Sequence, residues 1–82
     1  MLDVKLAASL RDVTGGADTI QVDAATIREL LRKLVERYPK LQGRLDQQQV
    51  AVSINGEIFR DDRNIAIPEG AEVYLLPRIQ GG

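Results

Sequence analysis

Apolar and polar residues alternate along the first ten positions of the chain. One side of this alternation carries only apolar residues, namely Leu2, Val4, Leu6, Ala8 and Leu10. A period of two predicts a β-strand with one buried face. Gly15 and Gly16 then indicate a turn, and a shorter alternation over residues 19–23 predicts a second strand. The two strands are expected to form a hairpin around a loop near residues 12–18.

An amphipathic helix is the clearest element of the sequence, and it begins after Thr26. Glu29 follows three residues later, which is the spacing of a capping box at a helix N-terminus. Apolar residues then recur at helical spacing, at Ile27, Leu30, Leu31, Leu34, Val35 and Tyr38. This spacing places them on one stripe of a helix. Pro39 ends the helix, because proline disfavours helical backbone at the residue before it.

Strands are predicted again after this helix. Residues 41–45 contain two leucines that suit one further turn of helix, and residues 50–54 alternate as a strand. Asn55 and Gly56 form the strongest short signal for a hairpin turn, because a type I′ turn needs positive φ at both positions. The strand that returns from this turn is expected at residues 58–60.

The last predicted strand covers residues 72–76 and follows a turn at residues 68–70. Pro77 has no N–H to donate, so the strand is expected to leave the sheet near that residue. The elements therefore follow the order β-β-α-β-β-β. One apolar helix stripe needs one apolar sheet face to cover it. The sequence thus predicts a small α+β roll, with a single main helix packed on a mixed sheet.

The composition narrows the possible classes of protein. The 82 residues suffice for one small domain, and 44% hydrophobic with 28% charged residues is the balance of a soluble globular protein. No apolar run has the length of a membrane span, and the N-terminus lacks the apolar stretch of a signal peptide. We therefore expect a cytoplasmic protein without a membrane partner. A net charge of −1 gives no electrostatic reason to expect nucleic-acid binding.

Side chains that carry catalysis or bind metals are scarce. The chain has no Cys and no His. Disulfides, thiolate metal sites and a cysteine nucleophile are therefore excluded, and the commonest general base is missing. Asp61 and Asp62 form a carboxylate pair, but a solvated loop is the favoured interpretation because no further metal ligand is in view. We predict that the chain has no metal site. We also predict that it is not an enzyme, and that any catalytic groups belong to a partner.

The sequence finishes on Gly81 and Gly82, shortly after the last predicted strand. We interpret residues 1–77 as the domain and residues 78–82 as a flexible tail. An extended tail reaches about 17 Å, and glycine allows another backbone to approach closely. The terminal carboxylate is ionised and is a poor electrophile, so it must be activated, for example as an acyl-adenylate made from ATP. An inert chain end is the alternative that the dipeptide alone leaves open.

Several short motifs, in order and spacing, give the sequence a family resemblance. They are Leu10-Arg11, the glycine turn at residues 15–16, the helix from Thr26, Tyr38-Pro39-x-Leu41, Ile54-Asn55-Gly56-Glu57, Pro68-x-Gly70-x-Glu72-Val73, Leu76-Pro77 and Gly81-Gly82. Together they resemble the MoaD/ThiS family of ubiquitin-like sulfur carriers over nearly the whole chain. The resemblance implies a β-grasp fold, with a mixed sheet of four to five strands packed on one main helix.

The resemblance also implies a function for Gly82. In the family, an E1-like adenylyltransferase of the MoeB type uses ATP and Mg to adenylate the C-terminal carboxylate. A sulfurtransferase or sulfide source then converts it to a thiocarboxylate, which delivers sulfur to a MoaE-like large subunit or a cysteine-synthase-like enzyme. The carrier itself binds no cofactor. Gly82 is therefore the expected adenylation site, and Arg78, Ile79, Gln80 and Gly81 are expected to thread into the partner.

An apolar partner surface is expected close to the tail. Tyr74 and Leu76 lie on the face of the last strand that points away from the helix, and with Pro77 they are interpreted as an interface. Phe59 is a further candidate for this surface, although capping of the core is its favoured interpretation. Arg78 is expected either to meet an acidic rim on the activating enzyme or to be solvated.

Two departures from MoaD leave the pathway open. MoaD often has aromatic residues on the first strand and a Pro-Pro pair before the tail, whereas this sequence has Ala7-Ala8 and Pro77-Arg78. These departures weaken the case for a molybdopterin synthase large subunit as the partner, so the sulfur acceptor is expected in a molybdopterin, cysteine or secondary-metabolite pathway, with more resemblance to carriers of the latter two. Two other functions stay open, namely a ubiquitin-like modifier joined through Gly82 to lysines of other proteins, and a β-grasp interaction module with an unreactive tail.

Overall fold

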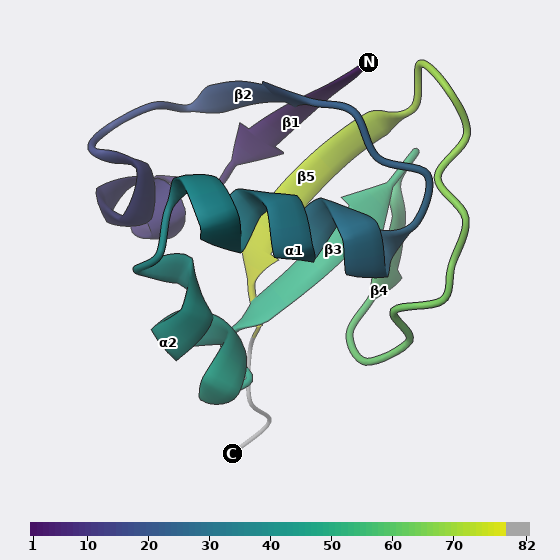
Figure 1. Cartoon of the computed structure of the whole chain (residues 1–82). Coiled ribbons are helices and arrows are strands. Elements are labelled where there is room, and N and C mark those ends of the chain that lie inside the picture. The colour runs from purple at the N-terminus through teal and green to yellow at the C-terminus, as the bar shows by residue number, and fades with distance from the viewer. Residues whose placement is uncertain (79–82) are drawn as a thin grey trace.

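Five strands form one mixed sheet, and helix α1 lies across one of its faces (Figure 1). The computed structural model describes residues 1–78. The strands are β1 (Leu2–Leu6), β2 (Thr19–Val22), β3 (Val50–Ile54), β4 (Glu57–Phe59) and β5 (Glu72–Pro77). They lie in the order β2-β1-β5-β3-β4, with β1 and β5 parallel and the other pairs antiparallel. The predicted α+β arrangement is confirmed.

The first strand is shorter than the alternation predicts. Beyond Leu6 the strand prediction was wrong, because the chain turns into the short 3-10 helix η1 (Ala8–Thr14). The N–H of Leu10 donates to the carbonyl oxygen of Ala7 at 2.9 Å, which starts this helix. Alanine has little preference for strands, and the helix buries Leu10 and Val13 as well as a strand would. Tertiary packing therefore overrides the period of two.

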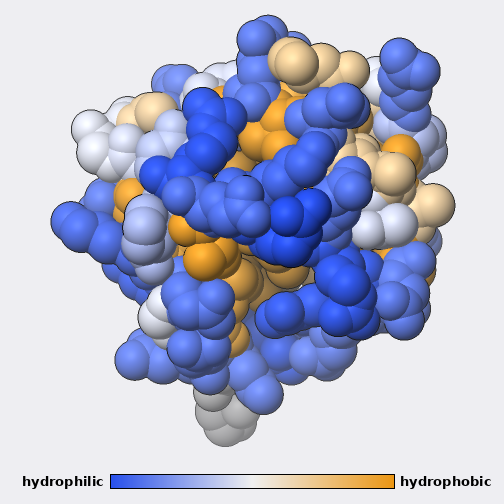
Figure 2. Space-filling view, in the orientation of Figure 1, coloured by the Kyte–Doolittle hydropathy of each residue, from blue (hydrophilic) through white to orange (hydrophobic). Residues whose placement is uncertain are grey.

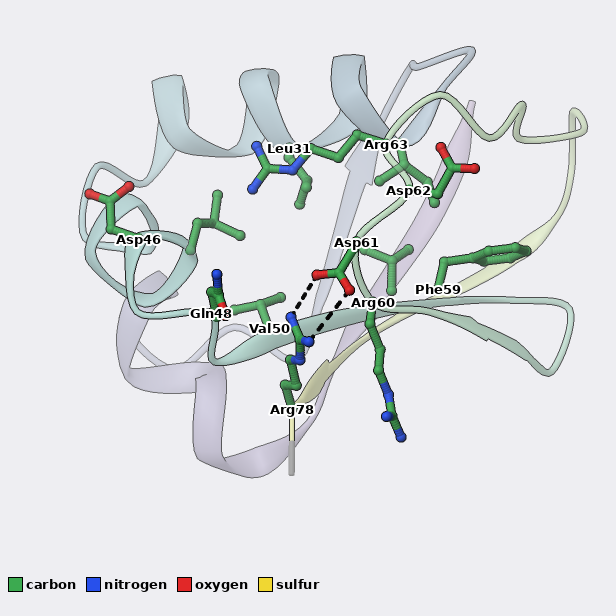
Figure 3. A pocket seen from close by; sticks show the side chains of 13 residues that line it. Leu31, Asp46, Gln48, Val50, Phe59, Arg60, Asp61, Asp62, Arg63 and Arg78 are labelled. Carbon is green, nitrogen blue, oxygen red and sulfur yellow. Dashed lines mark hydrogen bonds and ion pairs between the residues drawn. The ribbon is translucent and has the colours of Figure 1, made fainter. Parts of the chain in front are cut away.

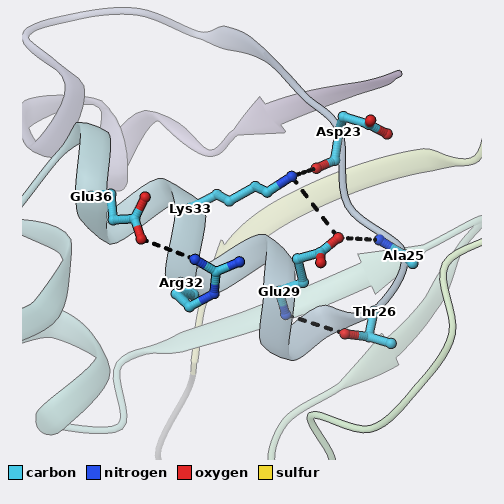
Figure 4. A network of polar contacts seen from close by, with 7 residues as sticks. All are labelled: Asp23, Ala25, Thr26, Glu29, Arg32, Lys33 and Glu36. Atoms are coloured by element: carbon cyan, nitrogen blue, oxygen red, sulfur yellow. Dashed lines mark hydrogen bonds and ion pairs between the residues drawn. The ribbon is translucent and has the colours of Figure 1, made fainter.

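Helix α1 (Ile27–Arg37) begins after Thr26 as predicted, and the threonine half of the capping box forms, whereas the Glu29 carboxylate reaches one residue beyond the N-cap, to Ala25 (Figure 4). Thr26 Oγ1 accepts a hydrogen bond from the Glu29 N–H at 3.2 Å, and Glu29 Oε1 accepts one from the Ala25 N–H at 2.9 Å. The Lys33 ammonium lies 4.0 Å from the same carboxylate. Side chains thus satisfy backbone donors that have no partner within the helix.

The core lies between α1 and the sheet. Its largest fully buried side chains are Val4, Leu10, Leu30, Leu34, Leu41, Val73 and Leu75. Helix α2 (Leu41–Asp46) contributes Leu41, which confirms the predicted turn of helix after α1. Within residues 1–78, no helix has both the length and the apolar character of a transmembrane span.

The β3–β4 hairpin has the predicted turn. Asn55 (φ 49°) and Gly56 (φ 88°) both have positive φ, as a type I′ turn requires. Strand β4 (Glu57–Phe59) starts one residue before the predicted range. The long connection from β4 to β5 then passes the start of α1, where the Ile27 N–H donates to the Ile65 carbonyl oxygen at 3.0 Å. This connection carries Asp61, whose carboxylate contacts Arg78 directly after the end of β5.

Candidate functional site at the base of the C-terminal tail

Strand β5 leads directly into the tail. Arg78 follows the strand, and its N–H donates to the carbonyl oxygen of Gln49 at 2.8 Å. Of the residues predicted to thread into a partner, Arg78 is described by the structure, whereas Ile79, Gln80 and Gly81 lie outside the described residues, as does the predicted adenylation site Gly82. Those assignments stay predictions, as does the division into a domain of residues 1–77 and a tail. The site that the structure describes is the base from which the tail continues.

The Arg78 side chain forms an ion pair within the chain. Its Nη1 lies 2.8 Å from Asp61 Oδ1, and its Nη2 lies 3.5 Å from Asp61 Oδ2 (Figure 3). The arginine side chain is 20% exposed and the aspartate side chain 76% exposed. The sequence predicts that Arg78 is solvated or meets a partner's acidic rim, whereas the structure pairs it with a carboxylate of the same chain. No signal in the sequence joins residues 61 and 78, because only the fold brings them together.

The neighbouring carboxylates have different partners. Asp61 binds Arg78, whereas Asp62 Oδ1 accepts a hydrogen bond from the Asn64 N–H at 2.9 Å. Asp62 therefore shapes its own loop. Within residues 1–78, no three Asp or Glu side chains are grouped closely enough to hold a metal ion.

A pocket of about 180 Å³ opens beside the ion pair (Figure 3). Apolar side chains from β3, β4 and both α-helices line it: Ile27, Leu31, Leu45, Val50, Val52 and Phe59. Figure 2 shows apolar surface in a hollow among polar side chains on this helix side of the molecule. The pocket is smaller than typical ligand pockets of about 300–1,000 Å³. A second hollow is also lined by Arg78, together with Pro77 and Arg44 among others.

The face of the sheet away from α1, called the open face below, carries a row of mixed side chains, namely Lys5, Tyr74, Ser53 and Ile58. Tyr74 lies opposite Ser53 on β3 and beside Lys5 on β1, and Ser53 in turn lies opposite Ile58 on β4. The Lys5 ammonium lies 5.5 Å from the centre of the Tyr74 ring, which is a cation–π distance. Tyr74 is half-buried, and Ile58 is 55% exposed. Sequence analysis missed Ile58, although its alternation with its neighbours could have placed it on this face.

Phe59 lies on the opposite face from Tyr74 and Leu76. It pairs with Val52 in the register of β3 and β4, and it packs against the core. The prediction that Phe59 shares a surface with Tyr74 and Leu76 was therefore wrong. The favoured interpretation, in which Phe59 caps the core, describes its position. The physical reason is the period of two, because a register that turns Ile58 outward turns Phe59 inward. Leu76 is half-buried on the open face, so it stays with Tyr74 in the predicted interface.

Comparison with known proteins gives a family. The family model described as the ThiS family matches residues 4–82. The molybdopterin synthase sulfur carrier subunit of Dictyostelium discoideum is 31% identical over 83 residues, covering 96% of this chain and 93% of that protein. These matches confirm the resemblance that the sequence motifs carry.

Solved structures give the same fold. Small archaeal modifier protein 1 from Haloferax volcanii is 32% identical, with a TM-score of 0.77, and the match covers 99% of this chain and 98% of that chain. A chain of the BexX/CysO complex from Amycolatopsis orientalis is 24% identical with a TM-score of 0.82, and the match covers both chains completely. Both neighbours have the ubiquitin-like β-grasp fold, as the sequence predicts for this chain. With a match that spans residues 4–82, the chain belongs to the ThiS family of small β-grasp sulfur carriers and ubiquitin-like modifiers.

Proposed function

We propose that this chain is a sulfur carrier that acts through the carboxylate of Gly82. The observation that carries the proposal is the family match over residues 4–82, which includes the Gly-Gly motif. An E1-like adenylyltransferase joins the carboxylate to the α-phosphorus of ATP and releases pyrophosphate. Sulfide attacks the acyl carbon and displaces AMP, which gives the thiocarboxylate directly. Where the persulfide of a sulfurtransferase attacks instead, AMP leaves in the same way, and a thiol then reduces the resulting acyl disulfide to release the thiocarboxylate. The product is a thiocarboxylate in which sulfur has replaced one oxygen.

The composition supports a carrier role for this chain. An ionised carboxylate resists attack by a nucleophile. In the acyl-adenylate, one carboxylate oxygen is bonded to the phosphorus of AMP, and AMP is a good leaving group. The chain supplies neither Cys nor His for this chemistry, so the nucleophile and the general acid or base come from the partner enzymes. Because the reaction consumes ATP, the proposed place of action is the cytoplasm.

The thiocarboxylate is proposed to donate sulfur to a biosynthetic enzyme. The Dictyostelium relative is named as a subunit of molybdopterin synthase, and the Amycolatopsis neighbour was solved in a complex with BexX. A sulfur-accepting synthase is therefore the partner class that we infer, of the molybdopterin, cysteine or secondary-metabolite type. The open face with Tyr74, Leu76 and Ile58 is the proposed docking surface, because Leu76 lies two residues before Arg78 and Tyr74 and Ile58 extend the apolar surface on the same face.

A protein modifier is the second candidate function. The Haloferax neighbour is named as a small archaeal modifier and is 32% identical. In this alternative, the adenylated Gly82 is transferred to lysines of other proteins. Both functions begin with the same adenylation, so they diverge only at the acceptor.

Intact-protein mass spectrometry tests the proposal. The chain is incubated with ATP, Mg, sulfide and each E1-like adenylyltransferase of its source organism. We expect a mass increase that equals the exchange of one oxygen for one sulfur, and a variant without Gly81 and Gly82 should show none. Conjugates on lysines of other proteins would instead favour the modifier. An unchanged mass with every enzyme, together with no conjugates, would contradict both functions and leave a β-grasp interaction module.

A further inference from the structure

Arg78 is anchored through two different groups. Its backbone N–H donates to the Gln49 carbonyl oxygen at 2.8 Å, and the N–H of Gln49 donates to the Arg44 carbonyl oxygen at 2.9 Å. The backbone of Arg78 is thereby connected to α2. Its guanidinium meets Asp61, which lies on the connection after β4. Because the two anchors hold different atoms, they fix both the position and the orientation of the residue.

The loop that carries Asp61 is fastened to the start of α1. The Arg28 N–H donates to the Arg63 carbonyl oxygen at 2.8 Å, and Arg28 Nη2 donates to Asn64 Oδ1 at 3.2 Å. The Asn64 N–H also donates to Asp62 Oδ1 at 2.9 Å. The Asp61 carboxylate therefore stands on a segment that is itself held in place.

The ion pair between Arg78 and Asp61 has a geometry that holds the arginine side chain in one direction, and it is called the clamp below. Both guanidinium nitrogens face the two carboxylate oxygens, at 2.8 and 3.5 Å, and this two-pronged contact fixes direction better than a point charge does. Arg60 lines the same pocket but points away from Asp61 (Figure 3). The Arg78 side chain is mostly covered, with 20% exposure, so the clamp rests against the pocket wall.

The proposed function requires four residues after Arg78 to enter the active site of another enzyme. We infer that Asp61 is a positioning residue for this step, because it holds Arg78 and so sets the point from which the tail continues. The inference rests on the proposed function. A tail base that is already ordered loses less conformational freedom on binding. Without the clamp, the activating enzyme should bind the carrier more weakly, while the chemistry at Gly82 is unchanged.

Tryptic cleavage tests the clamp without any partner enzyme. Trypsin must take the Arg78 side chain into its specificity pocket to cut the Arg78–Ile79 bond, so the ion pair with Asp61 must open first. We expect Asp61→Asn to speed the loss of residues 79–82 about two- to fivefold, from the modest strength of an exposed ion pair. Asp61→Ala should speed it at least as much, because asparagine still accepts one hydrogen bond. The matched control is Asp62→Asn, which removes a neighbouring charge and keeps an acceptor for the Asn64 N–H.

Adenylation kinetics test the positioning role. With the activating enzyme found above, Asp61→Asn should raise the KM for the carrier about two- to fivefold and leave kcat unchanged. Asp62→Asn should change neither value. Equal tryptic rates for Asp61→Asn, Asp62→Asn and the unchanged chain would overturn the clamp. A faster tryptic rate with an unchanged KM would overturn the positioning role, whereas a lack of adenylation in the unchanged chain would overturn the proposed function and leave the tryptic result standing.

Discussion

Leu75 and Leu76 are consecutive residues of β5 whose side chains lie on opposite faces of the sheet. Leu75 pairs with Val52 and is 0% exposed, in the core beneath α1. Leu76 pairs with Ala51 and is half-buried on the open face. Two leucines at consecutive positions therefore have different roles. One leucine stabilises the fold, and the other is available to a partner.

Truncation of these two leucines should separate stability from binding. Leu75→Ala is expected to lower the free energy of unfolding by about 2–5 kcal/mol, because it removes buried methyl groups and leaves a cavity. Leu76→Ala should cost about 1 kcal/mol or less, since its side chain is already partly in water. Chemical denaturation of both variants measures the difference. Equal losses of stability would contradict the assignment of the two faces.

Removal of the Thr26 hydroxyl should weaken the start of α1. Thr26→Ala is expected to lower the free energy of unfolding by about 1 kcal/mol, because the Glu29 N–H then loses its acceptor. Thr26→Ser keeps the oxygen and should stay close to the unchanged protein. Thermal denaturation followed by circular dichroism is the measurement. A serine variant as unstable as the alanine variant would show that the methyl group of Thr26, and not the cap, is what matters.

Two glycines should respond to alanine with opposite signs. A Cβ atom meets nothing within 4 Å at either Gly56 or Gly43, so backbone conformation alone decides the outcome. Gly56 has φ +88°, and alanine there should cost about 1–2 kcal/mol. Gly43 lies within α2, where alanine should stabilise the protein by about 0.5–1 kcal/mol. Denaturant midpoints of the two variants should therefore move in opposite directions, and a shift in the same direction would argue against this explanation.

Local signals explain why most of the fold could be predicted. The N-cap at Thr26, the Asn55-Gly56 turn and the apolar stripe of α1 each act over a few residues, and each was confirmed. The prediction failed after Leu6, where small residues continue the alternation but a 3-10 helix buries Leu10 equally well. A period-two pattern does not distinguish these two outcomes when the residues between are alanine and serine.

The site could be predicted only in part, because its key contact is made by the fold. Gly82 stands out in the sequence, and Tyr74 and Leu76 follow from the alternation of the last strand. The contact between Arg78 and Asp61 joins the end of the chain to a polar loop that has no pattern of its own. Only the position of that loop against α1 brings the two residues together.

Ile58 and Phe59 offer the sharpest test of the open face. They are neighbours on β4. Ile58 is 55% exposed and lies opposite Ser53, which in turn pairs with Tyr74. Phe59 packs against the core. Threonine is β-branched and is favoured in strands, as isoleucine and phenylalanine are, so strand preference is retained at both positions and apolar contact is lost. Phe59→Thr should lower the free energy of unfolding by about 2 kcal/mol or more, as expected for the loss of a largely covered ring.

Ile58→Thr should leave stability within about 0.5 kcal/mol, because its side chain already lies mostly in water. Its effect should instead fall on the proposed partners. If the open face docks the activating or sulfur-accepting enzyme, Ile58→Thr weakens that complex by about 1 kcal/mol or more, since apolar contacts in an interface exclude water. Titration calorimetry with each enzyme measures the dissociation constant, and denaturation of the same sample controls for folding. An unchanged affinity for both enzymes, with Tyr74→Ala equally without effect, would contradict the open face as the docking surface.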